Sequence, residues 1–316
     1  MSKTTKNGNL HKAKSAKNDE FYTRLADIER ECRHYREFFR GKTVYCNCDD
    51  ARESNFFRYF SLNFEFLGLK KLICTGYKKD GRGVCLVYEG DKNGNRKVDD
   101  DEIAVTELEG DGDFRSEECV KLLDEADVVV TNPPFSLFRE YIAQLVEHGK
   151  KFLVIGNQNA VTYKEIFPLI KDNKVWWGTD CVRWFVMPDN TDKTTKLSDR
   201  GENIAEGARS RWYTNIPHKK RNIPLDLFKK YNPVDYPKYD NYDAIEVSET
   251  VDIPMDYDGV MGVPITFLDK YCPEQFEIVG EFNHGKDGPF DFCTPSVDGK
   301  VIFKRIAIRR KRPEHA

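Results

Sequence analysis

The chain has 316 residues, of which 39% are hydrophobic and 33% charged, with a formal net charge of −3. These values suit a globular protein with one large and one smaller domain. No apolar run approaches the roughly 18 residues of a membrane-spanning helix, and the polar, Lys-rich N-terminus does not resemble a secretory signal. The nine cysteines lack regular spacing, which favours reduced thiols in a cytoplasmic protein.

The first half of the chain alternates predicted helices and strands. Residues 1–18 are expected to form a flexible basic arm. Apolar spacing predicts helices over 27–39, 54–68 and 138–148, and Ser54 is a suitable N-cap. Short runs of residues that favour β-strands predict strands at 43–46, 72–74, 126–131 and 152–155. The turn signal at 91–94, between 84–88 and 103–107, predicts a hairpin.

This alternation predicts an α/β fold, a doubly wound Rossmann-like sheet that is mostly parallel with an antiparallel edge hairpin. Strands at 182–187 and 211–214 are candidates for that antiparallel pair. After Ile216 the sequence becomes rich in Pro and Tyr. We therefore expect one domain over 19–216, with ligands at the carboxyl ends of its strands, and a smaller C-terminal region over 217–316.

The charge is unevenly distributed. Basic residues gather in the N-terminal arm, at 218–221 and at 304–312, whereas acids concentrate at 99–102 and 107–113. Folding can bring the basic segments together as a surface for nucleic-acid phosphates. Ordinary solvated surface charge is an equally good interpretation of this pattern.

The motif Asn132-Pro133-Pro134-Phe135 directly follows the expected strand. With Pro at about 5% of residues, an Asn-Pro-Pro-aromatic motif arises by chance in only a few of ~1,000 chains of this size. Two prolines fix φ and cannot continue a helix or the hydrogen-bond ladder of a β-sheet. The loop is therefore stiff, and its carbonyl groups are available to accept hydrogen bonds. The alternative is a rigid turn that only ends a strand.

This loop has the chemistry that methylation of an aromatic amine requires. The lone pair of adenine N6 is delocalised into the ring, and acceptors for its two N–H groups localise that lone pair on nitrogen. The side-chain oxygen of Asn132 and the carbonyl of Pro133 are candidates for these acceptors, and Phe135 is a candidate to stack on a base flipped out of the duplex. Positioning then dominates the reaction, and no covalent enzyme nucleophile is required.

The motif resembles the Asp/Asn/Ser-Pro-Pro-aromatic motif of the amino-methyltransferases. Further sequence segments resemble the EcoRI-type adenine-specific DNA methyltransferase family, so that the resemblance covers most of the chain. These segments are 17–23, 44–50, 54–57, 67–72, 236–247 and 259–280. The resemblance implies S-adenosylmethionine as methyl donor, double-stranded DNA as partner and a place in a restriction–modification system. We expect recognition of the DNA target in the region beyond residue 188, including the loop over 188–209 and the C-terminal region.

The resemblance also implies positions for the cofactor. Tyr22 and Thr23 belong to the N-terminal motif over its methionine end; Asp113 and Phe114 resemble the third motif, in which an acid receives the adenine amine. The usual Phe-x-Gly-x-Gly loop is replaced by Cys46 and the candidate ligands Asn47, Cys48, Asp49 and Asp50. The acid usually found after the second strand is missing, and Thr75 and Tyr77 flank a glycine there.

Other residues are candidates for contact with DNA: Arg183, Arg209, Arg211, Lys219, Lys220 and Arg221. Cys46 and Cys48 have no second pair at zinc spacing nearby, so no metal is expected. A monomer is favoured over an obligate dimer. Two alternatives remain open: a methyltransferase acting on RNA or on a protein amide, and a catalytically silent DNA-binding protein.

Overall fold

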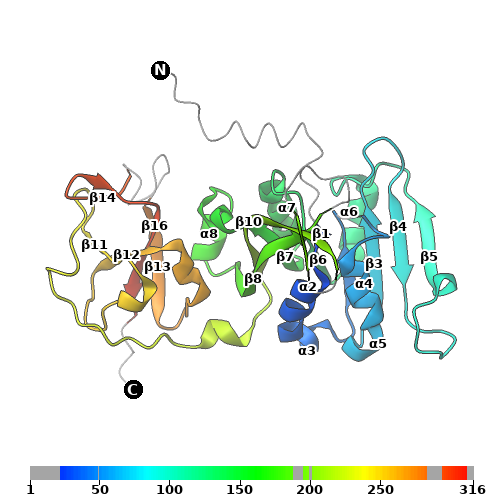
Figure 1. Cartoon of the computed structure of the whole chain (residues 1–316), viewed down its shortest axis with the longest axis horizontal. Coiled ribbons are helices and arrows are strands. Elements are labelled where there is room, and N and C mark those ends of the chain that lie inside the picture. Colours follow the sequence, from blue (N-terminus) through cyan, green and yellow to red (C-terminus); the bar gives the residue numbers. More distant parts are fainter. Residues whose placement is uncertain (1–21, 49, 188–194, 199–200, 283–293, 312–316) are drawn as a thin grey trace. The chain divides into compact units, whose positions relative to one another are not determined.

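The computed structural model describes residues 22–48, 50–187, 195–198, 201–282 and 294–311 (Figure 1). The chain divides into two compact units. Unit 1 comprises Met1–Gln158 and Gly178–Ile216, and unit 2 comprises Asn159–Trp177 and Pro217–Ala316. Unit 1 ends at Ile216, and Asn159–Trp177, which lies within the domain expected over 19–216, belongs to unit 2. The expected arm over 1–18 lies outside the described residues.

Unit 1 is built on a sheet that, among the described residues, has ten strands in the order β1-β8-β10-β7-β6-β2-β3-β4-β5, with β9 paired to β10. The strands are β1 Tyr22–Thr23, β2 Thr43–Cys46, β3 Lys71–Gly76, β4 Val84–Tyr88, β5 Ile103–Glu107, β6 Val128–Thr131, β7 Lys151–Asn157, β8 Trp176–Val186, β9 Lys196–Leu197 and β10 Asn203–Thr214. The central strands β7, β6, β2 and β3 are parallel. Antiparallel pairs extend the sheet on both sides, β10 next to β7 and β4 next to β3.

Helices cover both faces of this sheet (Figure 1). On one face, the helical segments α2 Leu25–Cys32, η1 Arg33–Tyr35, α3 Arg36–Phe39, α4 Asn55–Leu62 and α5 Phe64–Leu67 share an apolar cluster with the central strands. On the other face lie α6 Glu117–Glu125 and α7 Phe138–Glu147. The residues of β2 and β6 are all buried, which explains their continuous apolar sequence. The predicted doubly wound α/β fold is thereby confirmed.

Local side chains set the bounds of α4 and α5. The hydroxyl of Ser54 accepts a hydrogen bond from the backbone N–H of Phe56 at 3.1 Å, so Ser54 caps α4 as expected. Gly68 ends α5 with φ of 64°, a left-handed conformation that glycine adopts without strain. The single helix expected over 54–68 is two helices, because the Asn63 side chain bonds the carbonyl of Tyr59 at 2.8 Å and Asn63 leaves the helical conformation.

The order of the central strands reverses between β2 and β6. From β2 the chain continues to β3 on one side, whereas β6 and then β7 lie on the other. In open α/β sheets, ligands bind outside the carboxyl ends of the strands at such a reversal. The loop that starts at Asn47 and the loop that starts at Asn132 leave the sheet at this point.

Unit 2 contains a smaller, mixed sheet in the order β11-β12-β16-β13. Its elements are α8 Phe167–Lys171, η4 Lys219–Asn222, β11 Ala244–Glu246, η5 Thr250–Asp252, β12 Val260–Pro264, η6 Ile265–Asp269, β13 Phe276–Phe282, β14 Ser296–Val297, β15 Lys300–Val301 and β16 Arg305–Arg310; η3 Gln158–Thr162 begins at the boundary. A buried ion pair joins two strands: Arg305 donates from Nη2 to Oε1 of Glu246 at 2.6 Å. The hydroxyl of Tyr239 donates to the same carboxylate.

Candidate functional site

The loop after β6 carries the Asn132-Pro133-Pro134-Phe135 motif. Pro133 is buried, and Asn132 and Pro134 are half-buried. The N–H of Leu137 donates to the carbonyl of Pro134 at 2.9 Å and closes the turn into α7. Phe135 is partly buried and packs against the apolar cluster beneath α2 and α4. The loop is therefore a short, supported connection rather than a freely moving one.

A buried hydrogen bond joins the loop after β2 to the residue that precedes this motif. The Thr131 hydroxyl, at the last position of β6, donates to the backbone carbonyl of Asn47. Asn47 is only 4% exposed, and its side-chain oxygen accepts a bond from the hydroxyl of Tyr141 on α7. The two loops at the strand reversal thus share contacts at Asn47.

Cys48 takes the conformation that the missing glycine would have provided. Its φ is 65°, in the left-handed region that residues with a side chain rarely adopt. It occupies the position of the first glycine in the Phe-x-Gly-x-Gly pattern. Asp50 accepts bonds from the N–H groups of Arg52 at 2.9 Å and Glu53 at 3.2 Å, which shapes the turn towards α4. Asp49 lies outside the described residues.

A second pair of predicted segments meets at the end of β3. The hydroxyls of Thr75 and Tyr45 are hydrogen-bonded at 2.8 Å, and Tyr77 is 51% exposed. Gly112, with φ of 85°, lies so close to the chain that an added Cβ would be 2.5 Å from the carbonyl oxygen of Gly76. This close approach requires glycine and brings Asp113 to the carboxyl end of β3.

Asp113 is held as a charged carboxylate. Arg115 donates to it at 2.6 Å, and this contact holds the pKa of Asp113 below its ordinary value. Phe114 is buried, and its ring meets that of Tyr141 edge to face at 5.0 Å. An ionised acceptor beside an aromatic residue suits an amine-bearing ring such as adenine.

The N-terminal motif reaches the same edge of the sheet. β1 pairs antiparallel with β8, with Thr23 opposite Phe185 and Tyr22 opposite Val186. The side chain of Asn55, the first residue of α4, donates to the carbonyl of Thr23 at 2.8 Å. The hydroxyl of Thr23 is buried and has no hydrogen-bond partner among the described residues. A buried hydroxyl of this kind fits a site in which a ligand supplies the partner.

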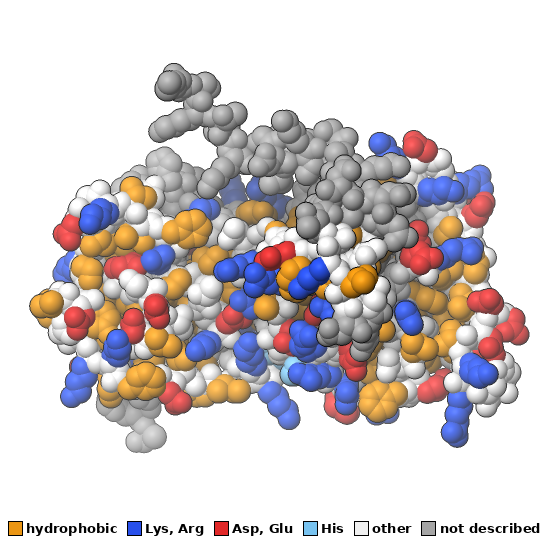
Figure 2. Space-filling model, in the orientation of Figure 1, with side chains coloured by type: hydrophobic (Ala, Val, Ile, Leu, Met, Phe, Trp, Pro, Cys, Tyr) orange, Lys and Arg blue, Asp and Glu red, His pale blue; other side chains and the backbone are white. Residues whose placement is uncertain are grey.

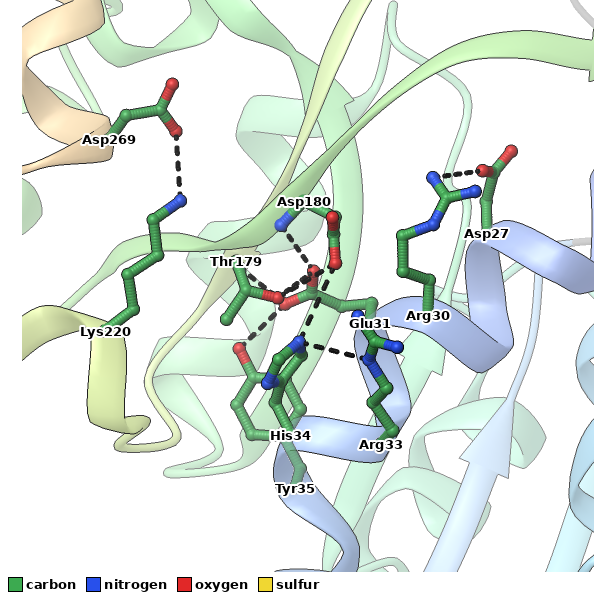
Figure 3. Close-up of polar contacts among 10 residues, drawn as sticks. All are labelled: Asp27, Arg30, Glu31, Arg33, His34, Tyr35, Thr179, Asp180, Lys220 and Asp269. Carbon is green, nitrogen blue, oxygen red and sulfur yellow. Dashed lines mark hydrogen bonds and ion pairs between the residues drawn. The ribbon is translucent and has the colours of Figure 1, made fainter.

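A buried carboxylate fixes the helix that follows this motif (Figure 3). Glu31 of α2 accepts bonds from the N–H groups of Thr179 and Asp180, both at 2.8 Å. The hydroxyls of Thr179 and Tyr35 donate to the same carboxylate at 2.9 Å. Burial raises the pKa of Glu31, and these bonds act in the opposite direction. We call this set of contacts the Glu31 clasp; it attaches α2 to β8.

Comparison with known proteins identifies the family. Residues 9–311 match the family described as adenine-specific methyltransferase EcoRI. The chain is 48% identical over 328 residues to the type II methyltransferase M.EcoRI of Escherichia coli, covering 99% of each protein. It is 40% identical over 279 residues to M.MgeORF184P of Mycoplasma genitalium, covering 85% of each. It is 39% identical to M.MpnI of Mycoplasma pneumoniae over the same length, covering 85% of this chain and 84% of that protein; both are also type II methyltransferases.

The chain belongs to the EcoRI family of adenine-specific methyltransferases.

This membership confirms the family expected from the sequence and the predicted class of enzyme, an adenine-specific DNA methyltransferase. The missing glycine loop is thus compatible with the family, and the left-handed Cys48 gives a structural reason. In the described part of the chain, no helix is long and apolar enough to cross a membrane.

The candidate DNA contacts fall into two groups, one in each unit. Arg183, Arg209 and Arg211 lie on β8 and β10 of unit 1; Lys219, Lys220 and Arg221 lie on η4 of unit 2. Arg209 and Lys219 are exposed. On the side drawn in Figure 2, the Lys and Arg side chains of the described residues are interspersed with acidic and apolar ones.

Several of these cations already have protein partners. Arg183 bonds Glu206 at 2.5 Å, Arg211 bonds Gln158 at 3.3 Å, and Lys220 lies 3.9 Å from Asp269. Arg221 bonds Asn173 at 2.6 Å and lies over the ring of Trp176, with 4.1 Å between guanidinium carbon and ring centroid. These contacts orient the side chains.

Sequence reasoning did not find Thr131, Tyr141 or Asn55 as parts of the site. Tyr141 lies in a helix of ordinary apolar periodicity, and its partner Asn47 is 94 residues away. Thr131 carries a weak signal, because it is a polar residue that ends an otherwise apolar strand. Only the folded sheet brings these hydroxyls to the loop after β2.

Proposed function

We propose that the chain is a site-specific DNA adenine N6-methyltransferase that uses S-adenosylmethionine and acts in a restriction–modification or host-protection system. The observation that carries this proposal is the Thr131–Asn47 hydrogen bond at the strand reversal. It joins the residue directly before the motif expected to hold the target amine to the loop expected to hold the methyl donor. An enzyme that transfers a group between two ligands must bring their sites together in this way.

The acceptor amine is assigned to the loop after β6. The side-chain oxygen of Asn132 and the carbonyl of Pro133 accept hydrogen bonds from the two N–H groups of adenine and leave the nitrogen lone pair available. Pro134 keeps the loop stiff, and Phe135 contacts the flipped base. The bound cofactor supplies an electrophilic methyl group on a sulfonium centre.

Residues of unit 1 fit this cofactor. Asp113 would accept a hydrogen bond from the adenine amine of the cofactor, and Phe114 and Tyr77 would contact its ring. Thr75 stands where an acid for the ribose hydroxyls is usual. The loop of Asn47, Cys48, Asp49 and Asp50 would hold the methionine end together with Tyr22 and Thr23. The buried hydroxyl of Thr23 and the charged carboxylate of Asp113 support the assignment.

DNA binding is assigned to both units. The duplex is contacted by Arg183, Arg209, Arg211, Lys219, Lys220 and Arg221, and residues 217–316 take part in recognition of the target. We propose that the enzyme acts as a monomer on one strand at a time. Since its substrate is DNA, the cytoplasm is its expected compartment.

The deciding experiment is transfer of labelled methyl from S-adenosylmethionine to duplex DNA, followed by nucleoside analysis. N6-Methyladenine is the expected product. Label in RNA or protein but not in DNA would replace the acceptor in this proposal. Tight DNA binding without any cofactor binding or transfer would indicate a silent DNA-binding protein instead.

A further inference from the structure

We propose that Tyr141 of α7 is a positioning residue, which fixes the shape of the loop after β2 before any ligand binds and thereby sets the affinity for the cofactor. The inference rests on the proposed function in assigning that loop to the cofactor. Its structural half, the fixing of the loop, stands on the contacts of Tyr141 and is testable without a cofactor.

Asn47 is held on both sides by buried hydroxyls. Tyr141 is fully buried and donates to the side-chain oxygen of Asn47, while Thr131 donates to the backbone carbonyl of the same residue. Burial raises the pKa of Tyr141 well above its ordinary value, so this hydroxyl remains a donor. Because water does not reach these groups, each bond is costly to lose.

The neighbouring residue explains why such fixing is needed. Cys48 has φ of 65°, a backbone conformation that is strained for a residue with a side chain. Its Sγ donates to the same Asn47 oxygen, at 3.5 Å. A glycine at this position would adopt the turn without strain, whereas here the Asn47 hydrogen bonds offset the strain.

The helix α7 also supports the other cofactor segment. Three residues after Tyr141, the side chain of Gln144 donates to the carbonyl of Phe114 at 3.1 Å. The Tyr141 ring itself packs edge to face against the ring of Phe114. One face of α7 therefore contacts both the Asn47 loop and the Asp113-Phe114 segment, and Tyr141 touches both.

The first test measures the loop in the protein without ligands. Tyr141→Phe removes the hydroxyl and keeps the ring against Phe114. We expect Cys48 to react with iodoacetamide several-fold faster in this variant, as measured by mass spectrometry. The exposed Cys181 on β8 is the internal reference, and its rate should not change. An unchanged Cys48 rate in a folded Tyr141→Phe protein would overturn the inference.

The second test measures cofactor binding by calorimetry. We expect Tyr141→Phe to weaken S-adenosylmethionine binding about tenfold, with kcat at saturating cofactor within about twofold of wild type. Tyr236→Phe is the matched control, because Tyr236 is a buried tyrosine of unit 2 that donates to the carbonyl of Asp252 at 2.8 Å, and it should lose stability without losing cofactor affinity.

The outcomes separate this inference from the proposed function. Unchanged affinity in Tyr141→Phe, or an equal loss in Tyr236→Phe, contradicts the positioning role. Faster Cys48 labelling in a protein whose wild type does not bind S-adenosylmethionine supports the fixing of the loop and rejects the proposed cofactor.

Discussion

At the scale of single residues, the two asparagines that follow β2 and β6 have different environments. Asn47 is buried, and hydroxyls bind both its side-chain oxygen and its carbonyl. Asn132 is half-buried at the start of a Pro-Pro loop. The first is suited to hold backbone in place, and the second to present an acceptor to a ligand.

Asn132→Ala should lower turnover by about a hundredfold or more, because one of two acceptors for the target amine is lost. Cofactor affinity, measured by calorimetry, should remain within about twofold of wild type. Asn132→Asp is the matched variant: it retains an acceptor oxygen and fits the family motif, so it should retain more activity than the alanine variant. Loss of cofactor affinity in Asn132→Ala would contradict this role.

The pH dependence of cofactor binding should reflect the lowered pKa of Asp113. Its ordinary value is 3.8, and Arg115 lowers it in the folded protein. The ion pair is therefore fully formed above that value, and its stabilisation is lost only as pH falls through the lower folded pKa. We expect cofactor affinity, measured by calorimetry, to show no titration of Asp113 between about pH 5 and 8.

Asp113→Asn should weaken cofactor binding by the same factor throughout that range. A decrease of wild-type affinity from pH 8 to 5 that disappears in Asp113→Asn would show that this carboxylate titrates at the site, which contradicts the lowered pKa.

At the scale of elements, the Glu31 clasp attaches α2 to a strand that is 148 residues away in the sequence. Gly178 permits the approach, since an added Cβ would be 2.2 Å from the carboxylate. β1, immediately before α2, carries the N-terminal motif. The clasp therefore stabilises unit 1 close to residues proposed to bind the cofactor.

Glu31→Ala should lower the free energy of unfolding by about 3 kcal/mol, because several buried donors lose their acceptor together. Denaturant unfolding followed by fluorescence measures this change. Glu29→Ala is the control from the same helix, where Glu29 is exposed, and it should change stability by no more than about 0.5 kcal/mol. Equal effects of the two substitutions would show that the clasp is not stabilising.

The sequence predicted those elements whose signals are local. The β-branched run before Asn132, the cap at Ser54 and the stop at Gly68 require only neighbours in the chain. The break between α4 and α5 was not predicted, because it depends on the Asn63 side chain bonding the carbonyl of Tyr59. The contacts of Asn47 and Glu31 were not predictable, since they depend on which strands become neighbours. The resemblance of the motifs predicted the candidate site, but it did not predict that the hydroxyls of Thr131 and Tyr141 support the loop after β2.

At the scale of the whole molecule, the residues assigned to the cofactor lie in unit 1, and unit 2 has a separate core. The Glu246–Arg305 ion pair belongs to that second core, where the two side chains are 5% and 13% exposed. A substitution that destabilises unit 2 should therefore weaken DNA binding more than cofactor binding.

Arg305→Ala leaves the buried Glu246 carboxylate without its cation and should destabilise unit 2 by about 3–5 kcal/mol. We expect loss of DNA binding by fluorescence anisotropy, with cofactor affinity retained. Arg309→Ala is the control on the same strand, because this side chain is 46% exposed and 3.9 Å from Glu277, and it should change stability little. Cofactor affinity lost in parallel with DNA binding would show that the units are not independent.

The segment Asn159–Trp177 belongs to unit 2, although unit 1 precedes and follows it in the chain. The polypeptide therefore passes between the units three times, after Gln158, Trp177 and Ile216. A fragment that ends at residue 216 would carry a piece of the other unit without its partner. Exchange of recognition modules between relatives, in the laboratory or in evolution, would then need two inserts spliced together rather than a single C-terminal replacement.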